Sequence, residues 1–337
     1  MKKRVLTGIN TTGTLHIGNY VGAIRPAIQD SRSPDVESFF FLADLHALIK
    51  CQDPERIERS RMQIAATWLA AGLDPERVVF YRQSDIPEIP TLNWLLTCST
   101  SKGQMNRAHA YKAATDQAVA AGKEPDADVT MGLFCYPILM AADILMFNAH
   151  EVPVGHDQIQ HLEMARDVAT RFNFQYAKPD EPFFTLPQAT GGSAVEVLPG
   201  LDGRKMSKSY GNSIMLGATA EETAKLIKKS PTDSERRITF DPVARPQVSA
   251  LLTTAGLVTG RDPKDIAEEI GDSGAGALKA YVIESVNEFL APHRERRAEL
   301  AKDMDSIRDI LHDGNKRANA IAEETLDQVR EAMGMKY

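Results

Sequence analysis

The chain has 337 residues, of which 43% are hydrophobic and 25% charged, the composition of an ordinary soluble globular protein. Its net charge of −7 argues against broad, non-specific DNA binding, although local basic patches still allow a specific RNA partner. Cys51, Cys98 and Cys135 form no CxxC pair, so we expect no metal site and no disulfide framework, and a reducing, cytoplasmic location. The most apolar region, residues 138–147, is too short to span a bilayer and carries Asp143, so we expect no membrane association.

The first part of the chain alternates strands and helices. We predict helices at residues 17–29 and 54–73, the second with apolar side chains at helical spacing. Buried strands are predicted at residues 4–9, 37–43 and 78–81. Strands and helices in this order predict a parallel sheet wound by helices.

Helices dominate from residue 90 onward. The polar stretch 116–128 interrupts a mostly helical region, residues 90–148, and is predicted to be a mobile loop. Later elements are predicted as strands at 152–155 and 195–198, a loop at 200–211, and helices at about 157–172, 220–229, 262–270, 278–303 and 304–333. The predicted fold class is therefore α/β: a doubly wound parallel sheet in residues 1–210, then a helical domain in residues 211–337. The sequence leaves open whether the last helix packs back on the first domain.

The segment Leu15-His16-Ile17-Gly18-Asn19 follows the first strand and opens a helix. In a doubly wound sheet, nucleotides bind at the carboxyl ends of the strands, where helix N-termini offer free N–H groups to phosphate. Gly18 would let a nucleotide approach closely, and His16 and Asn19 carry hydrogen-bond donors. So short a segment also fits a helix start with incidental polar residues.

The segment Lys205-Met206-Ser207-Lys208-Ser209 lies in the predicted loop 200–211. Two lysines and two serines on a loop make a cationic clamp that suits the charge developing on a leaving pyrophosphate. A solvated basic loop is the plainer interpretation. The two segments together, in this order, are a stronger signal than either alone.

Together these segments resemble the HIGH and KMSKS motifs of class I aminoacyl-tRNA synthetases, with Asn19 in place of the second histidine, as in the tryptophanyl members. The resemblance implies that ATP is a substrate, accompanied by Mg²⁺ without a dedicated protein site. It implies His16, Asn19, Lys205 and Lys208 as catalytic residues. The implied ATP-binding residues are Asn10, Thr11, Thr12, Gly18, Asn19, Gly155, His156, Asp157, Val197, Lys205, Met206, Ser207, Lys208 and Ser209.

Two further segments, residues 136–145 and 152–161, resemble the amino-acid-binding helix and the neighbouring strand end of bacterial tryptophanyl-tRNA synthetases. Physical chemistry agrees, because indole is a large apolar body with one N–H donor, and its pocket needs apolar walls and one acceptor. Asp143, in the middle of an apolar helix, would be that acceptor, although a buried structural ion pair is the alternative. The implied tryptophan-binding residues are Tyr136, Met140, Asp143, Val152, Val154, Gln158 and His46.

The resemblance has departures. The family usually has Gln-Pro-Ser/Thr where this chain has Asn10-Thr11-Thr12, and Lys112 is the nearest candidate for a family lysine that reaches the phosphates from the central loop. Basic clusters at 225–229, 236–237 and 294–297 would meet RNA phosphates, or form solvated helix faces.

The sequence therefore predicts an enzyme that activates tryptophan with ATP and transfers it to tRNA(Trp), with a homodimer implied by the family. Tyrosyl-tRNA synthetase is the nearest rival, sharing fold and chemistry. A non-catalytic paralogue that binds tryptophan or RNA is the second, and the presence of both catalytic motifs argues against it.

Overall fold

The computed structural model describes residues 2–178, 180–190, 198–204, 206 and 210–336. Within them the strands form one five-stranded parallel sheet in the order β3-β2-β1-β4-β5. Because the order reverses at β1, a crevice opens between the carboxyl ends of β1 and β4, where ligands bind in doubly wound folds. The strands are β1 (Lys3–Asn10), β2 (Val36–Ala43), β3 (Val79–Arg82), β4 (Glu151–Pro153) and β5 (Gln188–Thr190).

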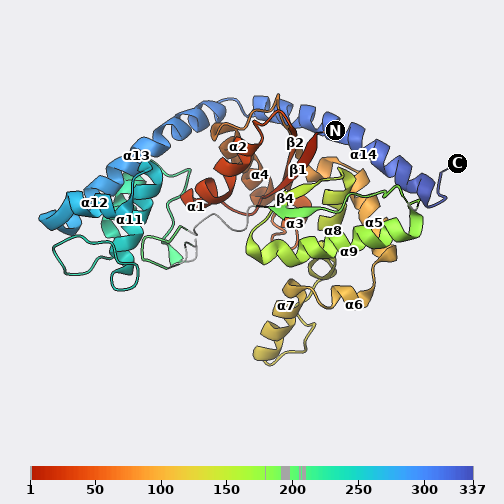
Figure 1. Cartoon of the computed structure of the whole chain (residues 1–337), viewed down its shortest axis with the longest axis horizontal. Helices are drawn as coiled ribbons and strands as arrows, with labels where there is room; N and C mark the ends of the chain where they lie inside the picture. Colours follow the sequence, from red (N-terminus) through yellow and green to blue (C-terminus); the bar gives the residue numbers. More distant parts are fainter. Residues whose placement is uncertain (1, 179, 191–197, 205, 207–209, 337) are drawn as a thin grey trace.

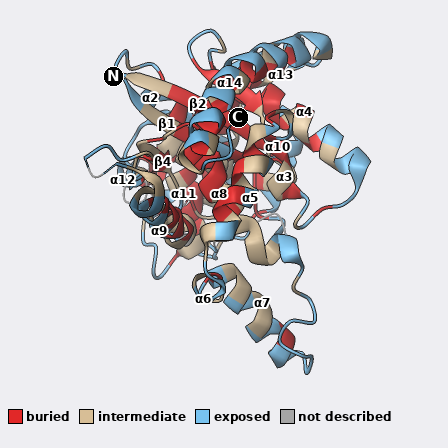
Figure 2. Cartoon of the chain, turned by 90° about the vertical axis from the view of Figure 1, so that its right-hand side faces the viewer, coloured by how far each residue is buried: buried red, intermediate tan, exposed pale blue. Residues whose placement is uncertain are grey.

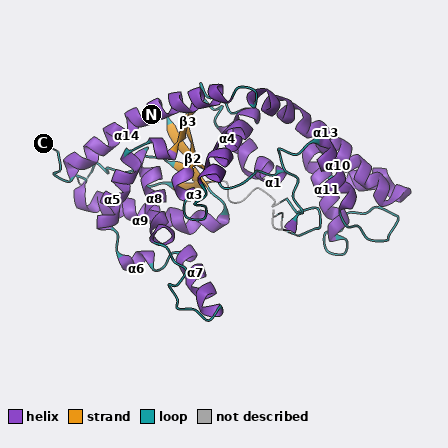
Figure 3. Cartoon of the chain, turned by 180° about the vertical axis from the view of Figure 1, so that it is seen from behind, coloured by secondary structure: helices purple, strands orange, loops and turns teal. Residues whose placement is uncertain are grey.

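The central strand β2 is apolar on both faces of the sheet. Side chains alternate along a strand, so Phe39 and Phe41 pack into one core and Phe40 and Leu42 into the other. Helices α2 (Arg25–Asp30) and α4 (Pro54–Ala70) cover the Phe40 face. Helices α5 (Glu88–Ser99), α8 (Met131–Met146) and α9 (Ile159–Tyr176) cover the Phe39 face, and Figure 3 shows the strands enclosed between helices. The doubly wound α/β class is confirmed.

Two short helices leave this body. Helices α6 (Lys102–Met105) and α7 (His109–Ala120) project from it, and Figures 1 and 2 show α7 standing away from the buried interior. The prediction of a polar loop at 116–128 is therefore wrong for residues 116–120, which belong to α7. Alanines at 113, 114, 118 and 120 favour continuation of the helix.

The C-terminal part is helical, as predicted. It contains α10 (Ala220–Lys229), α11 (Pro246–Thr259), α12 (Pro263–Ile270), α13 (Gly274–Leu300) and α14 (Met304–Ala332). Helices α13 and α14 follow one another along one side of the molecule, from the α10–α12 group past the sheet (Figure 1). The Phe40 core continues into this part through residues such as Ile227, Leu251 and Val282.

Helix α14 packs along β3, the strand at one edge of the sheet. A Cβ on Gly314 would lie 1.7 Å from the carbonyl oxygen of Phe80, so only glycine permits this approach. The Asn315 Oδ1 accepts a hydrogen bond of 3.0 Å from the Arg82 N–H, and an Arg317 Nη2 donates to the Val78 carbonyl at 2.7 Å. The helix thus satisfies polar backbone groups of an edge strand.

Two further expectations need correction. The helix predicted at 17–29 consists of three segments, α1 (Ile17–Asn19), the π-helix η1 (Tyr20–Ile24) and α2. The regular helix is interrupted because Pro26 has no N–H to donate and its ring clashes with the backbone carbonyl one turn earlier. The strand predicted at 195–198 lies, except for Leu198, outside the described residues, and the fifth strand is β5, which the prediction missed.

Candidate active site

Two turns follow the strands that flank the sheet crevice. After β1 the chain passes through residues 10–16 to α1, and after β4 it enters η3 (His156–Gln158). Gly13 has φ of 92°, a conformation that favours glycine, so the turn can reverse toward the helix start. The first predicted motif thus lies at the switch point of the sheet.

His16 and Asn19 hold the start of α1 together. The His16 N–H donates to the Asn19 Oδ1 at 3.0 Å, and the Asn19 N–H donates to the His16 Nδ1 at 3.3 Å. This reciprocal capping box directs both side chains to the helix start. Nearby, the Asn10 Oδ1 accepts hydrogen bonds from the Thr12 N–H and hydroxyl at 2.8 and 2.7 Å, while Thr11 is buried. The predicted phosphate-facing residues therefore belong to one ordered turn.

The second motif reaches the first through its methionine. A Cβ on Gly18 would lie 3.3 Å from the Met206 sulfur, and Met206 is buried. Backbone hydrogen bonds from Ile17 N–H to the Ile214 carbonyl (2.8 Å) and from Leu216 N–H to the Leu15 carbonyl (2.9 Å) join the segment after the motif to the same turn. The predicted residues Lys205, Ser207, Lys208 and Ser209 lie outside the described residues, as does Val197.

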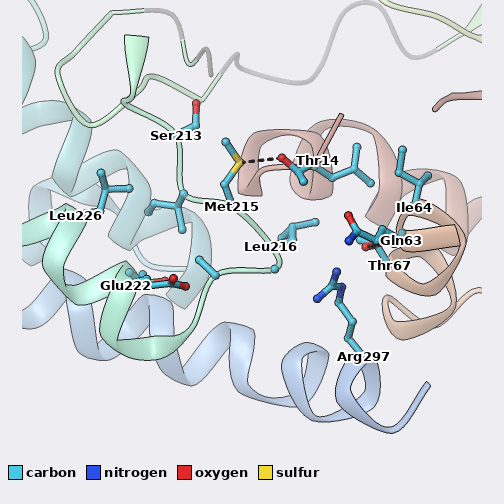
Figure 4. Close-up of a pocket in the computed structure, with 15 residues that line it drawn as sticks. Thr14, Gln63, Ile64, Thr67, Ser213, Met215, Leu216, Glu222, Leu226 and Arg297 are labelled. Carbon is cyan, nitrogen blue, oxygen red and sulfur yellow. Dashed lines mark hydrogen bonds between the residues drawn. The ribbon is translucent and has the colours of Figure 1, made fainter. Parts of the chain in front are cut away.

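A cavity of about 630 Å³ lies beside this backbone bridge (Figure 4). Residues from α4, α10, α13 and the turn surround it, and none of them is a predicted ATP or tryptophan contact. The cavity beside the His16 turn is therefore lined by residues of the sheet part and of the C-terminal helical part. The lining includes Thr14, Gln63, Thr67, Met215, Leu216, Glu222, Leu226 and Arg297.

Asp143 lies at the centre of a second, buried group of polar side chains. It is 1% exposed on α8, and its Oδ2 is 2.9 Å from the His46 Nε2. The Gln83 Nε2 donates to both carboxylate oxygens, at 2.8 and 2.9 Å. Burial raises the pKa of Asp143, while His46 and Gln83 act against that rise because their hydrogen bonds favour the charged form.

The predicted wall residues belong to the core that α8 helps to form. Met140 precedes Asp143 by nearly one helical turn, so the two side chains lie on one side of α8. Val152 is buried in the core against which Met140 and Val154 pack. One acceptor among apolar groups matches the requirement of an indole ring.

Tyr136 and Gln158 meet at a third residue, His161. The Tyr136 hydroxyl is 2.7 Å from the His161 Nε2, and the Gln158 Oε1 is 3.1 Å from the His161 Nδ1. The Tyr136 ring also meets the His46 ring edge to face, with centroids 6.2 Å apart. The structure thus brings the four predicted polar residues Tyr136, Asp143, Gln158 and His46 into one neighbourhood.

The sequence prediction missed two residues of this group, His161 and Gln83. His161 lies one helical turn after Gln158, so the spacing offered a signal. Gln83 follows β3 in a polar segment with no motif, and the packing of α8 beside this turn brings it to Asp143.

The remaining predicted residues lie nearby or apart. Gly155 precedes η3, and His156 and Asp157 lie in it; the Asp157 side chain is outside what the structure describes. Lys112 is exposed on the projecting helix α7. Among the described residues, no group of three or more His, Cys, Asp or Glu is placed to hold a metal ion, and no helix has the length and apolarity that crossing a bilayer requires.

Known proteins share this sequence and fold. Residues 1–291 match the family described as tRNA synthetases class I (W and Y). The tryptophan–tRNA ligase of Bordetella parapertussis is 54% identical over 99% of this chain and 74% of its own length, and that of Neisseria meningitidis is 52% identical over 99% and 98%. A tryptophanyl-tRNA synthetase structure from Campylobacter jejuni, solved with ADP and tryptophan, has a TM-score of 0.85 and 37% identity, covering 98% of this chain and 99% of its own.

Proposed function

The chain belongs to the class I tRNA synthetases for tryptophan and tyrosine and acts as a tryptophan–tRNA ligase, and from this premise we propose which of its residues carry each step. The chain would first join the carboxylate of tryptophan to the α-phosphorus of ATP, releasing pyrophosphate. It would then transfer the tryptophanyl group to tRNA(Trp). The family includes tyrosine enzymes, so the choice of amino acid depends on the pocket.

The pocket around Asp143 carries the choice of tryptophan. Its buried carboxylate is hydrogen-bonded to Gln83 and His46, and the indole N–H would be one further donor to it. Met140, Val152 and Val154 form the apolar walls. Tyr136 and Gln158, which meet at His161, would hold the ammonium and carboxylate of the amino acid, and His46 would lie beside them.

The His16 turn and the 205–209 loop carry the chemistry. N–H groups at the start of α1, with His16 and Asn19, would bind phosphate oxygens, and Gly18 and Met206 would flank the nucleotide. Lys205 and Lys208 would stabilise the charge that develops on departing pyrophosphate. The reaction needs no covalent enzyme intermediate, since positioning and electrostatic stabilisation lower the barrier.

Further assignments complete this proposal. Residues 1–210 would bind ATP and tryptophan, and residues 211–337 would bind tRNA. Asn10, Thr11, Thr12, Gly155, His156 and Asp157 would border ATP, and Mg²⁺ would arrive with it. We also propose a homodimer located in the cytoplasm, where tRNA is charged.

ATP–pyrophosphate exchange with each of the twenty amino acids tests this function. The observation that carries it is the buried carboxylate of Asp143 on an otherwise apolar helix. We expect strong exchange with tryptophan and almost none with tyrosine or phenylalanine. Equal or stronger exchange with tyrosine would favour the tyrosyl enzyme, and no exchange with any amino acid would favour a non-catalytic paralogue.

A further inference from the structure

The turn after β2 begins a short helix whose first N–H groups are capped from another strand. Helix α3 (Asp44–Ala47) follows Ala43, which has no side-chain acceptor to cap it. The Gln83 Oε1, from the turn after β3, accepts the N–H of Leu45 at 3.1 Å and that of His46 at 3.4 Å. Gln83 therefore does for α3 what a capping side chain normally does within its own helix.

The capping is reciprocal between the two turns. The Asp44 Oδ1 accepts the Ser84 N–H at 2.9 Å, and its Oδ2 accepts the Ser84 hydroxyl at 2.6 Å. An Arg61 Nη1 donates to the same Oδ2 at 3.1 Å. The 3-10 turn η2 (Gln83–Asp85) is thus held to α3 from both sides.

The other end of the Gln83 side chain faces Asp143. Gln83 is 0% exposed, and its amide donates to both oxygens of that carboxylate, at 2.8 and 2.9 Å. His46, whose backbone N–H lies at the acceptor end of the same amide, has its ring on the Asp143 Oδ2 at 2.9 Å. The buried Gln83 amide therefore contacts the Asp143 carboxylate at one end and the backbone of His46 at the other, and the His46 ring meets the same carboxylate.

The described hydrogen bonds on Asp143 do not use all of its acceptor positions. A carboxylate has about four acceptor positions. Gln83 and His46 take two on Oδ2, and Gln83 takes one on Oδ1. Because Oδ2 has two described contacts and Oδ1 has one, Oδ1 keeps an acceptor position for one more N–H.

We propose that Gln83 is a positioning residue for amino-acid selection, holding the Asp143 carboxylate and the His46 backbone in the arrangement that accepts the indole N–H. This inference rests on the proposed function of the Asp143 pocket. Gln83 acts through Asp143 and contacts no reacting atom.

Only an amide fits both ends of this position. Glutamate has the same shape but presents acceptors alone, so Gln83→Glu would set two carboxylates at hydrogen-bond distance, which must share a proton. One of these carboxylates is Asp143 on α8. The charged and titratable groups around the pair are Asp44 and His46 on α3, Tyr81 on β3 and Arg61 on α4. When that proton leaves at higher pH, repulsion would turn Asp143 away from the indole.

The test is the kinetics of tryptophan and phenylalanine activation by wild type, Gln83→Met and Gln83→Glu, with Ser84→Ala as a matched control. Ser84→Ala removes a 2.6 Å bond in the same turn without touching Asp143. We expect Gln83→Met to raise the tryptophan KM and lower the tryptophan-to-phenylalanine ratio of kcat/KM by about 10- to 100-fold, as for a lost bond to a charged group. The kcat should fall much less, and the control should stay within about threefold of wild type, because the Ser84 N–H still donates to Asp44 and Gln83 keeps its own bonds.

The pH profile of Gln83→Glu gives a readout that a merely structural role would not change. Relative to wild type, its tryptophan KM should be close to normal at low pH and rise as pH increases. A Gln83→Met enzyme that behaves like Ser84→Ala would overturn the proposal. So would a Gln83→Glu profile parallel to that of wild type, which decides the matter if Gln83→Met does not fold. Absence of tryptophan activation in wild type would instead contradict the proposed function itself.

Discussion

The Asp143 group, proposed to bind tryptophan and called the tryptophan side, and the His16 turn, proposed to bind ATP and called the nucleotide side, are built differently. Around Asp143, side chains from α3, η2 and α8 are joined to one another by short hydrogen bonds. Around His16, a three-residue helix meets a segment from the helical part across a backbone bridge, beside a cavity (Figure 4). The difference suggests that selection is preorganised, whereas transition-state stabilisation depends on groups brought together from two parts of the chain.

Removing the acceptor should have the largest effect. A site built around one hydrogen bond can reject an analogue that lacks it by roughly 10⁴- to 10⁵-fold. Wild type should therefore strongly prefer tryptophan to phenylalanine, and Asp143→Ala should lose most tryptophan activity and narrow this gap, since no buried acceptor is left unpaired. Exchange kinetics with both amino acids measure the ratio. If the ratio is unchanged in the variant, Asp143 is a structural residue and the tryptophan side is misassigned.

Removing a loop lysine should slow the chemistry by about 10²- to 10³-fold. Lys208→Ala should lower the rate of adenylate formation far more than tryptophan affinity, because the lysine meets charge that develops only as pyrophosphate departs. Single-turnover kinetics separate the two quantities. If Lys208→Ala formed the adenylate at the wild-type rate and bound tryptophan more weakly, the proposed division between the two sides would be contradicted.

The support of the tryptophan side by α14 can be weakened separately. Gly314→Ala would place a Cβ 1.7 Å from the Phe80 carbonyl oxygen, so α14 must shift, at a cost of about 1–3 kcal/mol in unfolding free energy. Because Asn315 contacts the Arg82 N–H beside η2, the tryptophan KM should rise several-fold. Urea denaturation and steady-state kinetics measure both effects.

Gly276→Ala is the control for this substitution, because a Cβ there meets nothing within 4 Å on α13. It should be neutral or stabilise by about 0.5–1 kcal/mol. If Gly314→Ala were equally benign, α14 would not hold the edge strand in the way described.

His293, which packs near the His16 turn through Tyr20, should make the stability of the protein sensitive to acid. Burial, and then Arg297, Arg296 and Arg294, lower the pKa of His293 to about 4 from 6.5, and its ring packs near Tyr20 of η1. Because the unfolded chain binds the proton more readily, stability is lost as pH falls from about 6.5 to about 4, by about 2 kcal/mol at pH 5. Unfolding free energies at pH 7 and pH 5 should differ less in His293→Phe, and an equal difference in both proteins would contradict the assignment.

Sequence patterns predict the strands and most helices well because their apolar periodicity is strong. They miss what depends on non-local geometry. The break of the 17–29 helix is different, because its cause, Pro26, stands in the sequence itself. Gln83 carries no local signal, since it meets Asp143, 60 residues away, only where α8 packs beside the turn after β3. The residues that resemble known motifs were identifiable, whereas the residue that orients them required the fold.

Calorimetric tryptophan binding without ATP tests the division between the two sides most directly. Wild type, Lys208→Ala and Asp143→Ala would be titrated under the same conditions, with folding checked by circular dichroism. We expect Lys208→Ala to bind tryptophan as wild type does, and Asp143→Ala to lose measurable binding. Strong binding by Asp143→Ala, or loss of binding in Lys208→Ala, would contradict a tryptophan pocket that is assembled independently of the nucleotide loop.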